Sequence, residues 1–265
     1  MKDWFLLDPD ITFLNHGSYG ACSKSVFKEY QDWQKKLENQ PVQFMTNQVY
    51  SAMEKSRKSM SQFVGCDDEE LVFFQNPTTA VTNVIYNLDL KPGDEVLMSN
   101  HEYGALVRAW NMWGEKTGVN IIQQDISMPV TTKENFIENF STGITAQTKV
   151  IFLSHITSST ALIFPIEKII KLAKELNILT IIDGAHVPAH IPLNIHDLGC
   201  DFYIGACHKW LCAPKGSSFL FVKKDHQDWV KPVVVSWGKD GDDPTPSEFI
   251  QNFQWQGTRD MSAFL

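Results

Sequence analysis

The residues best suited to chemistry follow short apolar runs of the chain. After the first of these runs, Asn76 and Pro77 are suited to cap and begin a helix, and Thr78 and Thr79 add two hydroxyl groups. Such a helix start offers free N–H groups and the positive end of the helix dipole, which together favour binding of a phosphate monoester. Simple capping of the helix is the alternative interpretation. The glycine loops of nucleoside-triphosphate and dinucleotide sites are absent from the sequence, which argues against a nucleotide-dependent oxidoreductase.

A single carboxylate ends the second apolar run. Asp183 is followed by two small residues that leave its side chain sterically open. A carboxylate buried there costs several kcal/mol unless a cation or hydrogen-bond donors satisfy it, so we expect a partner nearby. A carboxylate that only caps the next turn is the alternative. His186 and His190 are four residues apart, but Pro188 between them argues against a shared helix face, and we expect no metal site.

A lysine follows the third apolar run, where His208 and Lys209 are adjacent. Partial burial and a nearby cation lower the pKa of a lysine and make its amine a nucleophile that can form a Schiff base. Taken alone, an ordinary surface lysine is the commoner explanation. Together, the three segments offer donors for a phosphate, an acid for a pyridinium nitrogen and an amine for an aldehyde, which are the three partners that pyridoxal phosphate needs.

The elements that must position these residues alternate along the chain. Helical spacing of apolar residues occurs at 26–37, 49–63, 106–113 and 166–176, and Gly65 is suited to end the second of these helices. Strand, crossover helix and strand in this order predict an α/β fold, a three-layer αβα arrangement around a mostly parallel seven-stranded sheet. The candidate strands are 70–74, 95–99, 120–123, 149–154, 179–183, 201–204 and 218–222.

Composition limits the possible partners. The 265 residues carry a net charge of −8 without a basic cluster, which argues against nucleic acid or an anionic membrane as a partner. The five cysteines contain no Cys-x-x-Cys pair, so we expect a reducing compartment, and we place the protein in the cytoplasm. Neither a signal peptide nor a membrane-spanning run is evident.

Several motifs together resemble one known family. The Asp183-Gly-Ala-His segment followed by His208-Lys209 resembles the class V aminotransferases, which are fold-type I pyridoxal-phosphate enzymes. The segments at 13–20, 101–105, 154–161 and 256–260 look most like its isopenicillin N epimerase-like branch. The resemblance implies a pyridoxal-phosphate enzyme acting at Cα of an amino acid or amino-acid-derived substrate. A carbon–sulfur lyase, a cysteine desulfurase-like enzyme and an inactive truncated remnant are the alternatives.

The resemblance also implies roles for individual residues. Lys209 would be the Schiff-base lysine, Asp183 the partner of the pyridinium nitrogen, and Tyr103 the aromatic residue that stacks on the ring and a possible proton donor. Further contacts with the cofactor are implied for Thr78, Thr79, Ser158, His186 and His208. Gly257 and Thr258 would reach the cofactor of a neighbouring subunit, which implies a homodimer. Contacts with the substrate are implied for Asn15, His16 and Arg259.

The same resemblance suggests a division of the chain. We expect an N-terminal arm over 1–30, a cofactor-binding large domain over 31–250, and the start of a C-terminal segment over 251–265. Members of the family carry a small C-terminal domain, so we expect this chain to be a truncated version that lacks most of it.

Overall fold

One seven-stranded sheet organises the computed structural model, which describes residues 2–265. Every strand expected from the sequence is present, with bounds that differ by at most two residues. Glu70, expected to begin the first strand, instead ends the 3-10 turn Asp68–Glu70. The strands are β1 (Leu71–Phe74), β2 (Glu95–Ser99), β3 (Asn120–Gln124), β4 (Thr148–Ser154), β5 (Leu179–Asp183), β6 (Phe202–Ala206) and β7 (Ser218–Val222).

The sheet is mostly parallel, as expected. Its order is β1-β7-β6-β5-β4-β2-β3, and only β7 runs antiparallel to its neighbours. The carboxyl ends of β2, β4, β5 and β6 therefore meet at one edge of the sheet. In the register of β4 with β5, Ser154 lies opposite Asp183, so the last residues of these two strands are neighbours.

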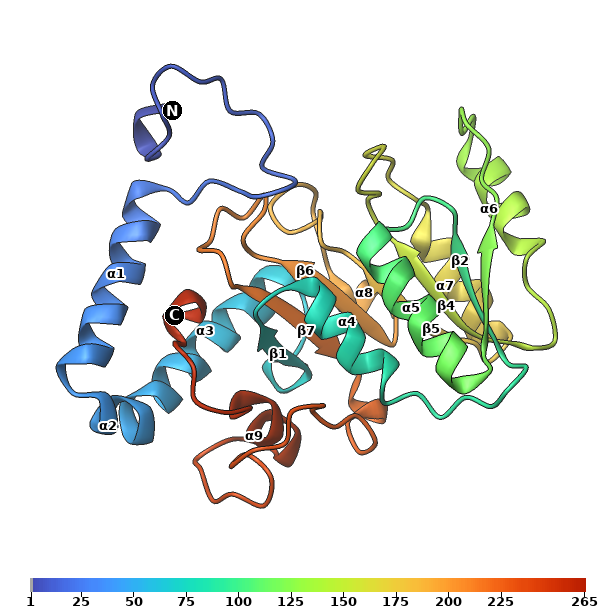
Figure 1. Ribbon diagram of the computed structural model, residues 1–265. Coiled ribbons are helices and arrows are strands. Elements are labelled where there is room, and N and C mark those ends of the chain that lie inside the picture. Colours follow the sequence, from blue (N-terminus) through green and yellow to red (C-terminus); the bar gives the residue numbers. More distant parts are fainter. Residues whose placement is uncertain (1) are drawn as a thin grey trace.

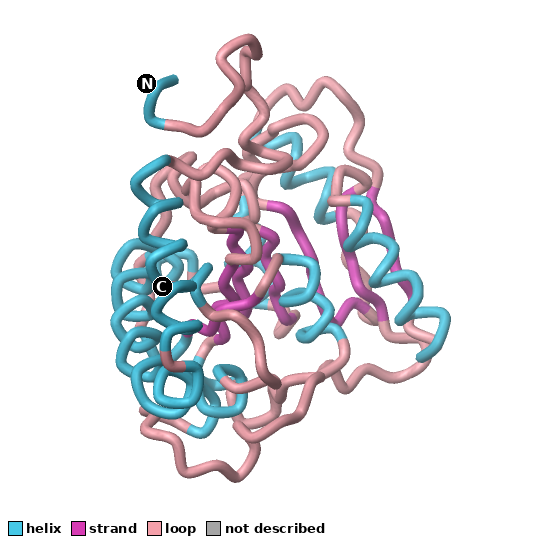
Figure 2. The backbone as a smooth tube through the Cα atoms, turned by 60° about the vertical axis from the view of Figure 1, so that its left-hand side comes forward, coloured by secondary structure: helices cyan, strands magenta, loops and turns pink. Residues whose placement is uncertain are grey.

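Helices cover both faces of the sheet and make it the middle of three layers (Figure 1). One face is covered by α3, α6, α7 and α8, and the other by α4, α5 and α9. Figure 2 shows the strands lying between helices on either side. The helices are α1 (Lys24–Asn39), α2 (Pro41–Gln43), α3 (Val49–Val64), α4 (Pro77–Ile85), α5 (Gly104–Thr117), α6 (Lys133–Ser141), α7 (Ile166–Glu175), α8 (Ile195–Leu198) and α9 (Glu248–Gln254), with a π-helical turn at Phe44–Gln48.

Alternation along the strands assigns side chains to two cores. In β4, Ile151 and Leu153 face one core, whereas Val150 and Phe152 face the other. Both faces are apolar because both are covered by helices, which explains why the strands read as continuous apolar runs rather than alternating ones.

The last part of the chain packs back onto the sheet. Phe253 of α9 lies 5.8 Å from the ring of Phe74, and the ring of Phe264 stacks on Phe73 at 5.3 Å between centroids. Residues 251–265 thus contribute to the covering of β1. No helix among the described residues is long and apolar enough to cross a membrane.

Candidate active site

A cavity of about 260 Å³ lies at the carboxyl ends of the parallel strands. This edge is where open α/β sheets bind ligands. The start of α4, the start of α5, the loops after β4, β5 and β6, and the N-terminal arm all contribute to its wall. The lining residues are Gly17, Ser18, Tyr19, Asn76, Pro77, Thr78, Tyr103, Ser154, Ile156, Ser158, Asp183, Ala185, His186, His208 and Lys209.

The lysine and a histidine meet inside this cavity. Nζ of Lys209 lies 3.0 Å from Nε2 of His186, whose other ring nitrogen lies 3.4 Å from Nε1 of Trp210. Burial, followed by the positive charge of Lys209, lowers the pKa of His186 to about 4. Burial also lowers the pKa of Lys209, against the opposing effect of Asp183. His186 is therefore neutral, and because its Nδ1 accepts from the indole N–H of Trp210, its Nε2 carries the ring proton and donates to the Lys209 amine, which is easier to deprotonate than that of an ordinary lysine.

The carboxylate of Asp183 is almost fully buried, with 5% of the residue exposed. Its Oδ1 accepts a hydrogen bond of 3.0 Å from the N–H of Ala185. Burial raises its pKa, whereas the Ala185 hydrogen bond and the charge of Lys209 act in the opposite direction. A protonated ring nitrogen placed beside this carboxylate would offset the cost of its burial.

The start of α4 has the predicted cap. Oδ1 of Asn76 accepts from both the N–H and the hydroxyl of Thr79, at 2.9 and 3.1 Å. Thr78 lines the cavity, whereas Thr79 is exposed, is absent from the lining, and uses its hydroxyl on the cap. His208 also lines the cavity, and its Nδ1 forms a hydrogen bond of 2.8 Å with the carbonyl oxygen of Ser217. Asn76, Thr78 and His208 thus form the polar wall suited to an anion.

The N-terminal arm closes one side of the cavity. The N–H of Gly20 donates to the carbonyl of His208 at 2.9 Å, and Nζ of Lys215 donates to the carbonyl of Gly20 at 2.6 Å. A Cβ at Gly20 would lie 2.1 Å from the carbonyl oxygen of Lys209. Only glycine permits this close approach, which presses the arm against the loop that carries the lysine.

Asn15 and His16, the two residues of the N-terminal arm that were expected to contact the substrate, do not line the cavity. The side chain of Asn15 bonds to Ser18 and closes a turn. Nδ1 of His16 accepts from the N–H of Ala21, and its ring packs against that of Phe13 at 4.9 Å. The residues that follow, 17–19, reach the cavity in their place.

The segment that includes Gly257, Thr258 and Arg259 lies outside the lining of this cavity. Thr258 is exposed, and Gly257 has a φ of 99°. The guanidinium of Arg259 lies 5.1 Å from the ring of Phe264, and its three nitrogens are buried without a hydrogen-bond partner. The structure does not bring these three residues to the cavity of their own chain.

Sequence reasoning missed Glu102. This acid is buried behind the cavity, where it accepts hydrogen bonds from Ser99 and Ser154. Burial raises its pKa to about 7. The motif at 101–105 contains it, but the sequence does not show whether an acid at the start of a helix faces solvent or the interior.

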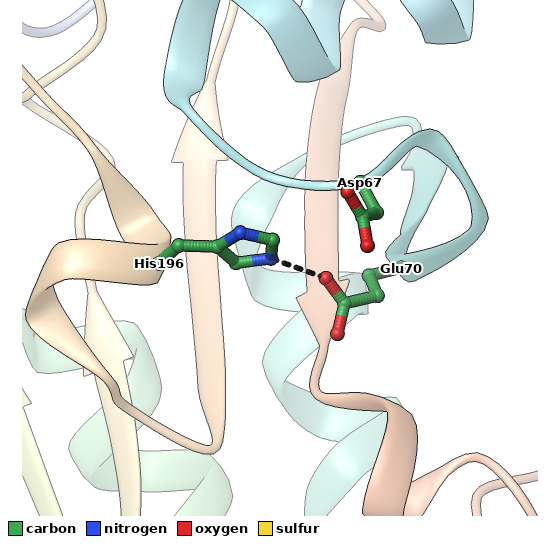
Figure 3. A group of neighbouring side chains, drawn as sticks. All are labelled: Asp67, Glu70 and His196. Atoms are coloured by element: carbon green, nitrogen blue, oxygen red, sulfur yellow. Dashed lines mark hydrogen bonds and ion pairs between the residues drawn. The ribbon is translucent and has the colours of Figure 1, made fainter.

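A second group of acids and a histidine lies away from the cavity (Figure 3). Asp67, Glu70 and His196 hold potential metal-binding atoms within 4.8 Å of one another. Nε2 of His196 lies 2.6 Å from one oxygen of Glu70, and the N–H of Lys224 donates to the other at 3.1 Å. Both oxygens of Glu70 already have partners, and we interpret the group as an ion pair that fastens α8 to the start of β1.

A larger groove of about 910 Å³ runs between α1, α3 and the last residues of the chain. Aromatic and aliphatic side chains such as Trp33, Phe63 and Phe264 line much of it, and none of the candidate residues does. The smaller cavity is therefore the better candidate for chemistry, because four titratable side chains whose pKa values are shifted by burial converge there: Asp183, His186, His208 and Lys209.

The chain is similar to several known proteins. Residues 21–251 match the family model of aminotransferase class-V. The chain is 30% identical to isopenicillin N epimerase from Amycolatopsis lactamdurans, in an alignment that covers 98% of this chain and 68% of that protein. It is also 30% identical to hercynylcysteine sulfoxide lyase from Schizosaccharomyces pombe, in an alignment that covers 90% of this chain and 61% of that protein. A structure of a C-DES mutant with glycine covalently linked to its PLP cofactor has the same fold, with a TM-score of 0.85 at 19% identity over 97% of this chain and 69% of the other.

Proposed function

The chain belongs to the class V aminotransferase family, and on this premise we propose that it is a pyridoxal-phosphate enzyme acting at Cα of an amino acid or an amino-acid-derived substrate, in the manner of an isopenicillin N epimerase. The single observation that carries the proposal is the convergence of Lys209, Asp183 and the start of α4 on one cavity.

The donor set of the cavity fits pyridoxal phosphate. The side chains of Asn76 and Thr78 and the N–H of Thr78 would hold the phosphate, with His208 as a further contact. Pro77 has no N–H, and those of Thr79 and Ala80 already bond to Asn76. Asp183, buried with a single hydrogen bond to its carboxylate among the described residues, would hold the ring nitrogen. Ser158 lines the wall after β4 and is a further candidate contact.

The reaction requires a proton to leave Cα. Pyridoxal phosphate, when bound, supplies a ring that accepts the electrons of that bond. The negative charge of Asp183 would keep a proton on the ring nitrogen. A protonated ring accepts electrons more readily than a neutral one. The amine of Lys209 removes the Cα proton, since burial has lowered its pKa toward the range in which it acts as a base.

Epimerisation also requires a proton to return on the opposite face. Tyr103 lines the cavity with its ring centroid 5.9 Å from Nζ of Lys209, so it can cover one face of the cofactor ring and deliver a proton from its phenol. His186 holds the amine of Lys209 through Nε2. Substrate contacts are assigned to the arm, where Asn15 and His16 support residues 17–19.

Absorption spectroscopy tests the proposal. Pyridoxal phosphate added to the purified protein should produce a visible absorption band that is lost in Lys209→Ala. Lys171→Ala, which removes an exposed lysine of α7, is the matched control and should retain the band. A wild-type protein that gives no band would overturn the proposal and favour an inactive remnant.

A carbon–sulfur lyase is the second candidate, because hercynylcysteine sulfoxide lyase is among the relatives that match this chain. Both reactions begin with removal of the Cα proton. Exchange of that proton with deuterated solvent, with the amino acid retained, would support epimerisation. Release of pyruvate from cysteine or a related thiol amino acid would support the lyase.

We further propose a homodimer in which Gly257 and Thr258 reach the cavity of the second subunit. Support comes from their position outside the cavity of their own chain, and from an exposed apolar run, Val233 to Val235 with Trp237. Sedimentation equilibrium should give twice the chain mass. A monomeric protein with full cofactor affinity would contradict this arrangement.

The compartment and the domain division are also proposals. All five cysteines are free, as is usual in the reducing cytoplasm, and a fluorescent fusion would test that location. We propose an arm over 1–30, a cofactor-binding domain over 31–250 and a following segment over 251–265. Limited proteolysis with and without pyridoxal phosphate should show that the cofactor protects the arm.

A further inference from the structure

A buried carboxylate joins two strand ends behind the cavity. Glu102 lies between β2 and α5, and one of its oxygens accepts from the hydroxyl of Ser99 at 2.5 Å. The other accepts from both the N–H and the hydroxyl of Ser154, at 2.8 and 2.5 Å. Ser99 ends β2 and Ser154 ends β4, and these strands are neighbours in the sheet. Glu102 thus ties together two of the strand ends that carry the cavity.

The residues next to this carboxylate face the cavity. Ser154 lines the cavity and lies opposite Asp183 in the sheet. Tyr103 also lines it and follows Glu102 directly in the chain. Fixing the side chain of Glu102 therefore fixes the backbone from which the ring of Tyr103 projects.

The chemistry of a carboxylate adds an orienting effect. When Glu102 is ionised it has no proton to donate, so the hydroxyl of Ser154 points toward its carboxylate, as the 2.5 Å contact places it. On the cavity side, Ser154 can then only accept a hydrogen bond. Burial raises the pKa of Glu102, and the charge of Asp183 adds a smaller effect in the same direction, whereas the contacts from β2 and β4 are the neutral serines.

We propose that Glu102 is a positioning residue that holds Tyr103 and Ser154 against the ring of bound pyridoxal phosphate. The inference rests on the proposed function of the cavity.

Three variants distinguish the effect of the Glu102 hydrogen bonds from that of its negative charge. Glu102→Ala removes all three hydrogen bonds and should weaken pyridoxal phosphate binding at least tenfold, or about 1.4 kcal/mol. Glu102→Gln can keep its carbonyl toward Ser154 and donate its amide to Ser99, so binding should stay within about threefold of wild type. Glu115→Gln neutralises an exposed acid on α5, the helix that follows Glu102, and should change nothing. The dissociation constant is measured by absorption titration of apoprotein with pyridoxal phosphate.

Circular dichroism of the bound cofactor supplies a second readout. A ring held in one orientation gives a visible dichroic band, and Glu102→Ala at saturating cofactor should reduce this band while the near-wild-type thermal midpoint shows that the fold persists. An unchanged band and an unchanged dissociation constant in Glu102→Ala would overturn the inference.

A double-mutant cycle tests the route through Ser154. If Glu102 acts through that serine, the effects of Glu102→Ala and Ser154→Ala on cofactor affinity should be less than additive. Additive effects would overturn this route. If the wild-type protein binds no cofactor, the proposed function itself fails; if it binds cofactor normally and Glu102→Ala does too, only the role of Glu102 fails.

Discussion

Nζ of Lys209 and Nε2 of His186 lie 3.0 Å apart in the candidate active site. Since the pKa of His186 is lowered to about 4, the imidazole is neutral at physiological pH. Its Nδ1 accepts from the indole N–H of Trp210, so its Nε2 carries the ring proton and donates to the neutral amine of Lys209. Two positive charges at this distance would repel each other strongly in a buried site. The pair therefore keeps a lysine available as a nucleophile and a base.

Loss of this hydrogen-bond partner should slow the reaction of Lys209 with the cofactor. In His186→Ala, capture of added pyridoxal phosphate should be about tenfold slower, because the loss of one hydrogen bond to a charged or reactive group costs about 1.5 kcal/mol. Stopped-flow absorption measures the rate. His190→Ala is the control, since that ring stacks on Trp210 at 4.4 Å rather than contacting the lysine. Equal rates in the two variants would argue against the role of His186.

Loss of the cap at the start of α4 should weaken binding of the phosphate group but not binding of the rest of the cofactor. Asn76→Ala loses the hydrogen bonds that order the start of α4, at a cost of about 1 kcal/mol of stability. Affinity for pyridoxal phosphate should fall several-fold, whereas affinity for pyridoxal, which lacks the phosphate, should change little. Parallel titrations with both compounds measure the difference. A similar loss for both would show that α4 does not bind the phosphate.

Close packing behind the carboxylate should make Gly184 intolerant of a side chain. A Cβ there would lie 2.1 Å from Cζ of Tyr203, which is fully buried. Gly184→Ala should lower the free energy of unfolding by about 3 kcal/mol, as overpacking of a core does. Gly104→Ala is the matched control, since its nearest contact is the flexible end of Arg108 at 3.2 Å. Urea unfolding measures both, and equal stabilities would contradict the packing described.

A buried histidine should make the protein sensitive to acid. Nδ1 of His155 lies 3.0 Å from the hydroxyl of Tyr203, and burial lowers its pKa from 6.5 to about 4. Between these pH values the unfolded chain binds more protons at this site, so its contribution to stability falls as the pH falls. His155→Asn removes that proton uptake. The free energy of unfolding of the variant minus that of wild type should therefore be about 2 kcal/mol larger at pH 5 than at pH 7, so that the variant is relatively more stable in acid.

Urea unfolding of wild type and His155→Asn at both pH values measures this difference. The shift is read as a change between pH values, so any constant cost of losing the histidine ring cancels. A difference that does not depend on pH would show that His155 titrates normally in the folded protein.

Local signals were sufficient to predict much of the architecture. The strands are short apolar runs because both faces of the sheet are covered, and a run such as 179–183 is recognisable without knowing its neighbours. The cap at Asn76 and the left-handed Gly65 at the end of α3 are also local, since each depends on hydrogen bonds within a few residues. Helices α6 and α9 were not expected, because their apolar residues are few and gain their burial from distant parts of the chain.

By itself, the sequence identified the residues that we propose carry the chemistry. Asp183, Lys209 and the start of α4 each end or follow a strand, and parallel strands bring such ends to one edge of the sheet. Only the tertiary structure decided which neighbours complete the site. It placed His186 rather than His190 beside the lysine, brought residues 17–19 to the cavity in front of Asn15 and His16, and buried Glu102 between two strand ends. These relations depend on burial and on contacts between residues far apart in the chain, and the side-chain type alone does not reveal either.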